Sequence, residues 1–251
     1  PPLATARAAL LALFLPIAAL PASRRVLSLY VLRFFNDGVE ATVAAAALAL
    51  FCHNAWAAGC IVYSLAVGIK MNALLWAPGV AVLLVQARGP LGGGALIAAC
   101  AAVQVALGAP FVAAGHGRAY VRKAFELDRA FLQKWSVNGA AYAADTFASA
   151  ALSRALTVAH LGALLVWGHT RWAAASGGLP RLVGLDRLRV WPSAAGDARG
   201  GPPPPQRRGW WAWATGYPPR RLAAAHTLRT LLTANLLGVA AARTIHYQFY
   251  A

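Results

Sequence analysis

Long apolar runs separated by short polar stretches dominate the pattern of this 251-residue chain. Six runs approach the length of a helix that enters or crosses a membrane, which takes about 20 apolar residues for a straight crossing. They occupy residues 4–22, 39–52, 57–86, 92–114, 146–168 and 222–242. The run at 57–86 is too long for one crossing and is interrupted by Lys70, Met71 and Asn72, so it predicts a helical hairpin. The pattern therefore predicts an all-α, polytopic transmembrane helical protein.

The composition agrees with a membrane protein, because 59% of the residues are hydrophobic and only 12% are charged. In soluble domains roughly a quarter of residues are charged. The net charge of +16 would suggest nucleic acid as a partner in a soluble chain. Here the basic residues cluster between apolar runs, where they hold loops on the cytosolic side, so no nucleic acid is expected. The three cysteines are expected to be packing residues.

One long polar segment, residues 170–221, carries nine arginines, two aspartates and a Gly-Gly-Pro-Pro-Pro-Pro tract. Such a composition predicts a flexible basic loop that lies in the cytosol by the positive-inside rule. The loop divides the chain into transmembrane helices at 1–169, the loop itself, and a last helix with a polar-aromatic ending at 222–251.

Counting membrane crossings backwards from the basic loop places other polar stretches on the opposite side. They are residues 23–40, 70–72, 115–145 and those after 242. The same count places turns at residues 53–56 and 86–89 on the cytosolic side with the basic loop. The stretch 115–145 has an amphipathic pattern, which predicts a helix lying along the membrane surface. The gathering of charged, amide and aromatic residues on one side predicts a functional site there.

Ionisable residues at membrane depth are costly and suggest function. Arg33 and Asp37 are four residues apart, so either they serve a ligand or they neutralise each other on one helix face. Lys70 has no acidic neighbour in the sequence, and its place at a helix break favours the binding of an anion.

The polar-aromatic ending at residues 243–250 contains Arg243 and His246 beside three aromatic side chains. This set suits a phosphate next to a sugar ring, and the alternative is an interfacial aromatic anchor. His160 and His169 are nine apart and cannot face one metal from a single helix, so no metal site is expected.

Several of these motifs occur together in a characteristic order. They are residues 31–37 (Val-Leu-Arg-Phe-Phe-Asn-Asp), 63–75 (Tyr-Ser-Leu-Ala-Val-Gly-Ile-Lys-Met-Asn-Ala-Leu-Leu), 107–111, 120–138 with Lys-Trp-Ser-Val-Asn at its end, and 233–250 with His-Tyr-Gln-Phe-Tyr. The series resembles the dolichyl-phosphate-mannose-dependent alpha-1,3-mannosyltransferases of the asparagine-linked glycosylation pathway. These enzymes form glycosyltransferase family 58 of the GT-C superfamily.

The resemblance implies a partial GT-C fold in the endoplasmic reticulum membrane, with several crossings and a lumenal active site. It implies transfer of mannose from dolichyl-phosphate mannose to a pentamannosyl lipid-linked oligosaccharide, so the partners are a lipid-linked donor and acceptor. A beta-linked donor that gives an alpha-linked product requires inversion, hence one displacement assisted by a carboxylate base. No cofactor is implied with certainty, and the oligomeric state is left open.

The resemblance also implies which residues contact the substrates. They are Arg33, Asn36, Asp37, Lys70, Asn72, Arg129, Lys134, Trp135, Asn138, Arg243, His246, Gln248 and Tyr250. In GT-C enzymes the presumed acidic base lies in the first lumenal loop, which we expect upstream of Pro1, so the stretch alone is expected to be inactive. After Asn138 this chain has Gly139-Ala140 where the family usually has Trp-Arg, which puts acceptor contacts there in doubt.

Two other functions fit the pattern. A multi-pass transporter or lipid-handling protein would also contain broken helices such as the one at Lys70. Another GT-C polyprenyl-phosphate sugar transferase would share the same physical features.

Overall fold

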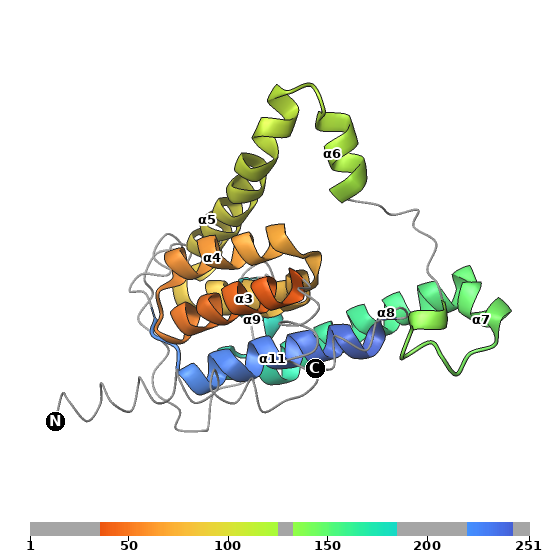
Figure 1. Ribbon diagram of the computed structural model, residues 1–251. Coiled ribbons are helices and arrows are strands. Elements are labelled where there is room, and N and C mark those ends of the chain that lie inside the picture. Colours follow the sequence, from red (N-terminus) through yellow and green to blue (C-terminus); the bar gives the residue numbers. More distant parts are fainter. Residues whose placement is uncertain (1–35, 125–132, 185–219, 243–251) are drawn as a thin grey trace, which may run out of the picture.

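The computed structural model of the chain describes residues 36–124, 133–184 and 220–242. Every regular element within these three ranges is a helix, which confirms the all-α prediction for them (Figure 1). The predicted run at 4–22 lies outside the described residues, as does most of the basic loop.

Helices α3 (Asn36–Cys52) and α4 (Trp56–Ile69) form an antiparallel hairpin. Alanine, the best helix former, supplies much of α3 and lets the two helices approach closely. Asn54 turns the chain between them with a left-handed φ of 62°. Its side-chain amide donates to the Leu222 carbonyl (3.0 Å) and accepts from the Leu222 N–H (2.7 Å), so this turn is fixed to the last described segment.

The predicted break at Lys70 is confirmed. Lys70 is extended, the 3-10 helix η3 (Met71–Trp76) follows, and then α5 (Ala77–Ala113) begins. Helix α5 is itself divided at Gly89, whose φ of 72° is open to glycine but strained for other residues. Pro90 starts the second half, where its fixed φ and missing N–H are tolerated, so the predicted turn at 86–89 is a sharp kink.

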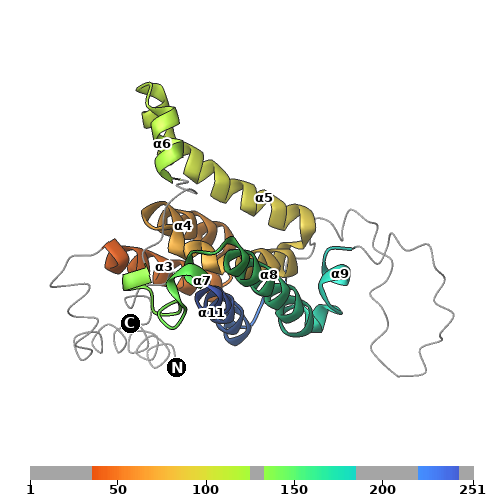
Figure 2. The same ribbon diagram turned by 90° about the vertical axis from the view of Figure 1, so that its right-hand side faces the viewer.

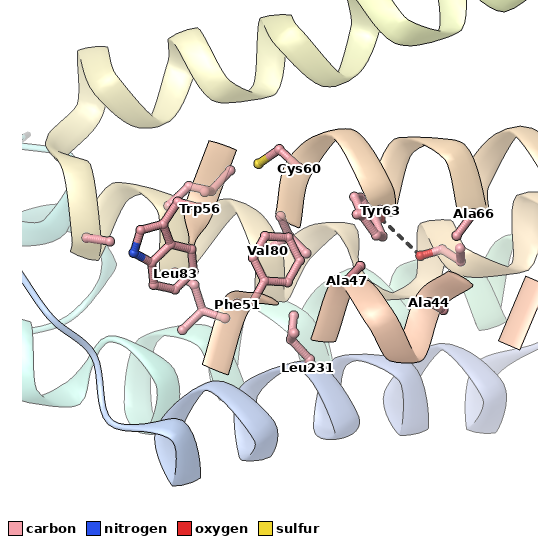
Figure 3. Packing of buried hydrophobic residues seen from close by; sticks show 13 residues of the cluster. Ala44, Ala47, Phe51, Trp56, Cys60, Tyr63, Ala66, Val80, Leu83 and Leu231 are labelled. Atoms are coloured by element: carbon pink, nitrogen blue, oxygen red, sulfur yellow. Dashed lines mark hydrogen bonds between the residues drawn. The ribbon is translucent and has the colours of Figure 1, made fainter. Parts of the chain in front are cut away.

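The core lies among α3, α4, the first half of α5, and α11 (Ala224–Ala241) (Figure 3). The Phe51 ring stacks on Trp56 with 5.7 Å between centroids. It also lies so close to Gly59 that a Cβ there would be 2.6 Å from the ring. Leu83 and Leu231 close the cluster and are fully buried.

Polar side chains join α4 to the second half of α5. The Ser64 hydroxyl donates to the Cys100 carbonyl (2.7 Å), and the Gln104 amide donates to the Ser64 hydroxyl (2.8 Å). The Cys100 thiol donates to the Cys60 carbonyl (3.4 Å), and Cys60 is buried in the core, as expected of packing cysteines. Past these contacts the second half of α5 rises away from the remaining helices (Figures 1 and 2).

The next elements are short before a long helix follows. They are α6 (Gly117–Ala124), η4 (Gln133–Trp135), α7 (Ala144–Ala148) and α8 (Ala150–Trp167). Within the stretch 115–145, where a helix along the membrane surface was predicted, α6 is helical, and its position relative to a membrane stays a prediction. The run predicted at 146–168 is divided, because Ser149 adopts an extended conformation and its hydroxyl accepts from the Leu152 N–H (3.2 Å) as the N-cap of α8.

The first part of the segment predicted as a flexible loop, residues 170–184, is instead largely turns of helix. They form η5 (Gly168–Trp172), η6 (Ala174–Ser176) and α9 (Leu179–Leu182). The physical reason is Trp172, which is buried and donates its indole N–H to the Thr233 hydroxyl (2.9 Å). The polar composition of the segment did not indicate that Trp172 is buried. The prediction of a flexible loop was therefore wrong for residues 170–184.

Long-range hydrogen bonds gather several segments at the N-terminal end of α11. Gln86 donates to the Trp172 carbonyl (2.8 Å) and lies 2.9 Å from the His226 ring. The Arg220 N–H donates to the Ala87 carbonyl (3.0 Å), next to the Asn54 turn described above. These segments are the ones that the crossing count placed on one side of the membrane.

The apolar outer surface fits a lipid environment. Within the described residues, Met71–Ala113 and Ala150–Trp172 are long and apolar enough to cross a membrane. Helix α8 lies beside α11 in both views, yet none of its residues is buried, and Val158 and Leu165 are widely exposed (Figures 1 and 2). In water such a surface would be a liability, whereas hydrocarbon solvates it.

Candidate functional site

An ion pair between Asp37 and Lys70 lies at the end of the bundle opposite the Asn54 turn. Asp37 stands in the first turn of α3 and Lys70 closes α4, so each charge also complements the helix dipole beside it. Asp37 is buried, and the side chain of Lys70 is 22% exposed. The pair therefore lies at the edge of the core, with its cation reachable from outside.

This pairing changes the interpretation of both residues. Sequence spacing left two roles open for Arg33 and Asp37, and because Arg33 lies outside the described residues both stay predictions. Lys70, which has no acidic neighbour in sequence, obtains one through folding, 33 positions away. Anion binding by Lys70 stays a prediction, and it now involves an ammonium group that Asp37 orients.

Glu40 joins this group and was not singled out from the sequence. It is buried one turn after Asp37 and lies within electrostatic range of both Asp37 and Lys70. The spacing of three between the two carboxylates was the available signal, since residues i and i+3 share a helix face. Among the described residues, Asp37, Glu40 and Lys70 are thus near enough at this corner to influence one another electrostatically.

The main chain around Lys70 is held from both sides. Its N–H donates to the Ala66 carbonyl (3.0 Å), and its carbonyl accepts from the Ala73 N–H (3.3 Å). The buried Tyr63 hydroxyl donates to the Ala73 carbonyl (3.0 Å), as Figure 3 shows. Asn72 is half-buried within this short helix. These hydrogen bonds fix the backbone at the helix break and with it the position of Lys70.

A second predicted residue, Asn138, caps the far end of α11. Its side-chain N–H group donates to the carbonyls of Val239 and Ala242, each at 2.8 Å. Carbonyls in the last turn of a helix otherwise lack intrahelical partners. Ser136 shapes the same loop by accepting from the Gly139 N–H (3.0 Å). Asn138 therefore ties the loop after η4 to the residue that precedes the 243–250 motif.

The two groups belong to the same end of the bundle. Helix η3, which follows Lys70, packs on α11 near its C-terminal end, where a Cβ on Gly238 would lie 2.6 Å from the Leu75 side chain. The structure thus brings together three parts of the chain that the crossing count placed on one side. They are the start of α3, the Lys70 break, and the loop at Asn138.

The remaining predicted site residues divide into two sets. Asn36 and Lys134 are exposed, and Trp135 ends η4. Outside the described residues lie Arg33, Arg129, Arg243, His246, Gln248 and Tyr250. Within residues 36–124, 133–184 and 220–242, no group of three or more His, Cys, Asp or Glu side chains is arranged to hold a metal ion.

Comparison with known proteins decides the family. The model of the ALG3 protein family matches residues 5–251. The chain belongs to the ALG3 protein family. It is 32% identical to a relative from Arabidopsis thaliana over 91% of this chain and 49% of the relative. It is 34% identical to relatives from Mus musculus and Homo sapiens, over 91% of this chain and 46% of each.

These three relatives carry the name Dol-P-Man:Man(5)GlcNAc(2)-PP-Dol alpha-1,3-mannosyltransferase. The chain spans about half the length of the curated relatives that it matches. No solved structure matches this ALG3 family chain.

Proposed function

We propose that this chain is part of a mannosyltransferase of the endoplasmic reticulum membrane. It would transfer mannose in alpha-1,3 linkage from dolichyl-phosphate mannose to the pentamannosyl lipid-linked oligosaccharide. Membership of the ALG3 family carries the proposal, since the relatives are named for this reaction. A multi-pass GT-C fold is part of the proposal, and the helical architecture with its apolar surface supports it. The family favours the transferase over the transporter.

The end of the bundle with Asp37, Lys70 and Asn138 is proposed to face the lumen. The separation of bonded segments into two ends supports this topology, because it matches the crossing count from the basic loop. On this proposal the kink at Gly89 and the Trp172 anchor lie on the cytosolic side.

Lys70 is proposed to bind the donor phosphate together with Arg243 and His246. A lysine at a helix break offers an ammonium group that Asp37 aims, whereas an arginine adds two parallel hydrogen bonds to phosphate oxygens. The capping of α11 by Asn138 supports the grouping, because Ala242 directly precedes Arg243.

A complementation experiment tests the activity. The protein that carries this chain, expressed at the length of its relatives in cells that lack the activity, should convert the pentamannosyl lipid to the hexamannosyl lipid. Persistent accumulation of the pentamannosyl lipid, despite correct insertion into the membrane, would rule out the assignment.

A tag experiment tests the topology. An epitope placed at residues 202–208 should be reached by antibody when only the plasma membrane is permeabilised. An epitope at residues 115–117 should be protected until the inner membranes are opened. The reverse pattern would invert the proposed orientation.

A further inference from the structure

Helix α6 turns back on the end of α5 through a tight reversal. Gly115 adopts a left-handed φ of 78°, which permits the turn. The His116 N–H donates to the Phe111 carbonyl (2.8 Å), and the Tyr120 N–H donates to the His116 carbonyl (2.9 Å). Figures 1 and 2 show α6 folded back at the tip of the rising half of α5.

One side of α6 is packed on α5. The Tyr120 ring stacks on Phe111 with 4.8 Å between centroids and 15° between planes. It rests against Gly108, where a Cβ would lie 2.9 Å from the ring, and a Cβ on Gly117 would lie 3.2 Å from the Val112 side chain. These contacts fix the rotation of α6 about its own axis.

The opposite side of α6 is basic. At 100° per residue, Arg118 and Arg122 are about 200° from Tyr120, and both are exposed. Residues four apart on a helix have neighbouring side chains, so the two guanidinium groups can meet one ligand. The helix contains no acidic residue that would neutralise them.

Apolar side chains are also exposed at this tip: Val121 lies one turn from Arg118 on α6, whereas Phe111 and Val112 lie on α5 and contact the Tyr120 side of α6. Phe111 is 49% exposed, Val112 62% and Val121 53%. A ligand that fits both surfaces has an anionic head and a hydrocarbon tail. Since arginine binds phosphate oxygens in a bidentate manner, the head is best supplied by phosphate.

We propose that Arg118 and Arg122 bind the diphosphate of the polyprenyl-diphosphate-linked acceptor, with its lipid chain on the exposed apolar tip of α5. This inference rests on the proposed function, because the relatives' names describe an acceptor with a PP group and a donor with a single P group. A diphosphate esterified at both ends keeps two negative charges at neutral pH, which matches two guanidinium groups. The donor phosphodiester has one charge, and it is assigned to Lys70.

The test measures binding without requiring catalysis. The protein that carries this chain, at the length of its relatives, is placed in nanodiscs of neutral phosphatidylcholine. Dissociation constants are measured for the pentamannosyl acceptor lipid and for dolichyl-phosphate mannose. R118Q/R122Q should weaken acceptor binding at least tenfold and change donor binding less than twofold. R118K/R122K should weaken acceptor binding less than R118Q/R122Q does, because lysine keeps the positive charge and loses only the bidentate hydrogen bonds.

Arg154, an exposed arginine on α8, provides the matched control, and R154Q should leave both constants unchanged. Equal loss of donor and acceptor binding in R118Q/R122Q would overturn the inference. So would unchanged acceptor binding, or a loss seen only in nanodiscs that contain phosphatidylserine, because α6 would then bind bulk anionic lipid. If the parent protein binds the acceptor through these arginines but transfers no mannose, the inference holds and the proposed function fails.

Discussion

Two neighbouring glycines in α5 provide a sharp test of the kink at Gly89. A Cβ on Gly93 would lie 3.0 Å from the Val85 nitrogen and 3.1 Å from the Leu84 carbonyl carbon. Both neighbours belong to the main chain before the kink. Gly94 has nothing within 4 Å of the same position and is exposed. Replacement of Gly93 by alanine must therefore push apart the two halves of α5, whereas replacement of Gly94 meets open space.

The magnitudes follow from two opposing effects. Alanine is favoured over glycine inside a helix by about 0.5–1 kcal/mol, and this gain applies to both positions. Added volume in a packed site costs about 1–3 kcal/mol, and here the obstacle is main chain that cannot rotate away. The gain cancels in the comparison, so Gly93→Ala should be less stable than Gly94→Ala by about 1–3 kcal/mol.

The assay is the melting temperature of the purified protein in one detergent, measured for the parent and both variants. Gly94→Ala should equal or exceed the parent. Gly93→Ala should melt lower than Gly94→Ala, by roughly 2–4 °C per kcal/mol on the scale of soluble domains of this size. If the two variants melt together, the halves of α5 do not pack closely at Gly93, and the bend at Gly89 is wrong.

Four further predictions concern individual side chains. Lys70→Ala should raise the KM for the donor more than it lowers kcat, with Lys70→Arg closer to the parent; a pure loss of folded protein would contradict this role. His246→Ala should lower kcat, because the loss of a hydrogen bond to the leaving phosphate raises the activation barrier by about 2–4 kcal/mol. The measurement compares kcat of the variant and the parent at equal amounts of folded protein. Gln104→Leu should lower the melting temperature through a loss of about 0.6–1.7 kcal/mol, since it removes bonds to Ser64 between two helices. Asn138→Ala should speed proteolysis after η4, because two carbonyl contacts of the loop are lost; unchanged cleavage would show that the cap is dispensable.

The sequence predicted the helix breaks well, because glycine, proline and charged residues interrupt apolar runs for local reasons. The extended backbone at Lys70 and the left-handed Gly89 are both at predicted positions. The start of α8 was missed by four residues, because a single N-cap serine competes with a continuous apolar run. Local chemistry of that kind was visible in the sequence but was outweighed by hydrophobicity.

Contacts between distant residues could not be predicted in the same way. The Asp37–Lys70 pair spans 33 positions, and the Trp172–Thr233 bond spans 61. Asp37 also has Arg33 four positions away in the sequence, and that pairing stays a prediction because Arg33 lies outside the described residues. Trp172 follows an arginine in a polar segment, where composition indicates exposure. Its burial depends on the packing of η5 on α5 and α8 and on its hydrogen bond to Thr233 of α11.

The polar side chains at the two ends of the bundle differ in their hydrogen-bond partners. This difference separates residues that stabilise the fold from residues that can contact a substrate. Helices in a membrane satisfy their own backbone groups, so polar side chains that remain must bond to loops and helix ends. At the Asn54 end, both atoms of the amide are used by Leu222, and both atoms of the Gln86 amide are used by Trp172 and His226. Each end of these two amides therefore already has a partner within the protein. At the other end, the side chain of Lys70 is 22% exposed beside Asp37. The pairing of each group therefore agrees with the prediction from the sequence that the Lys70 end is the place for substrate.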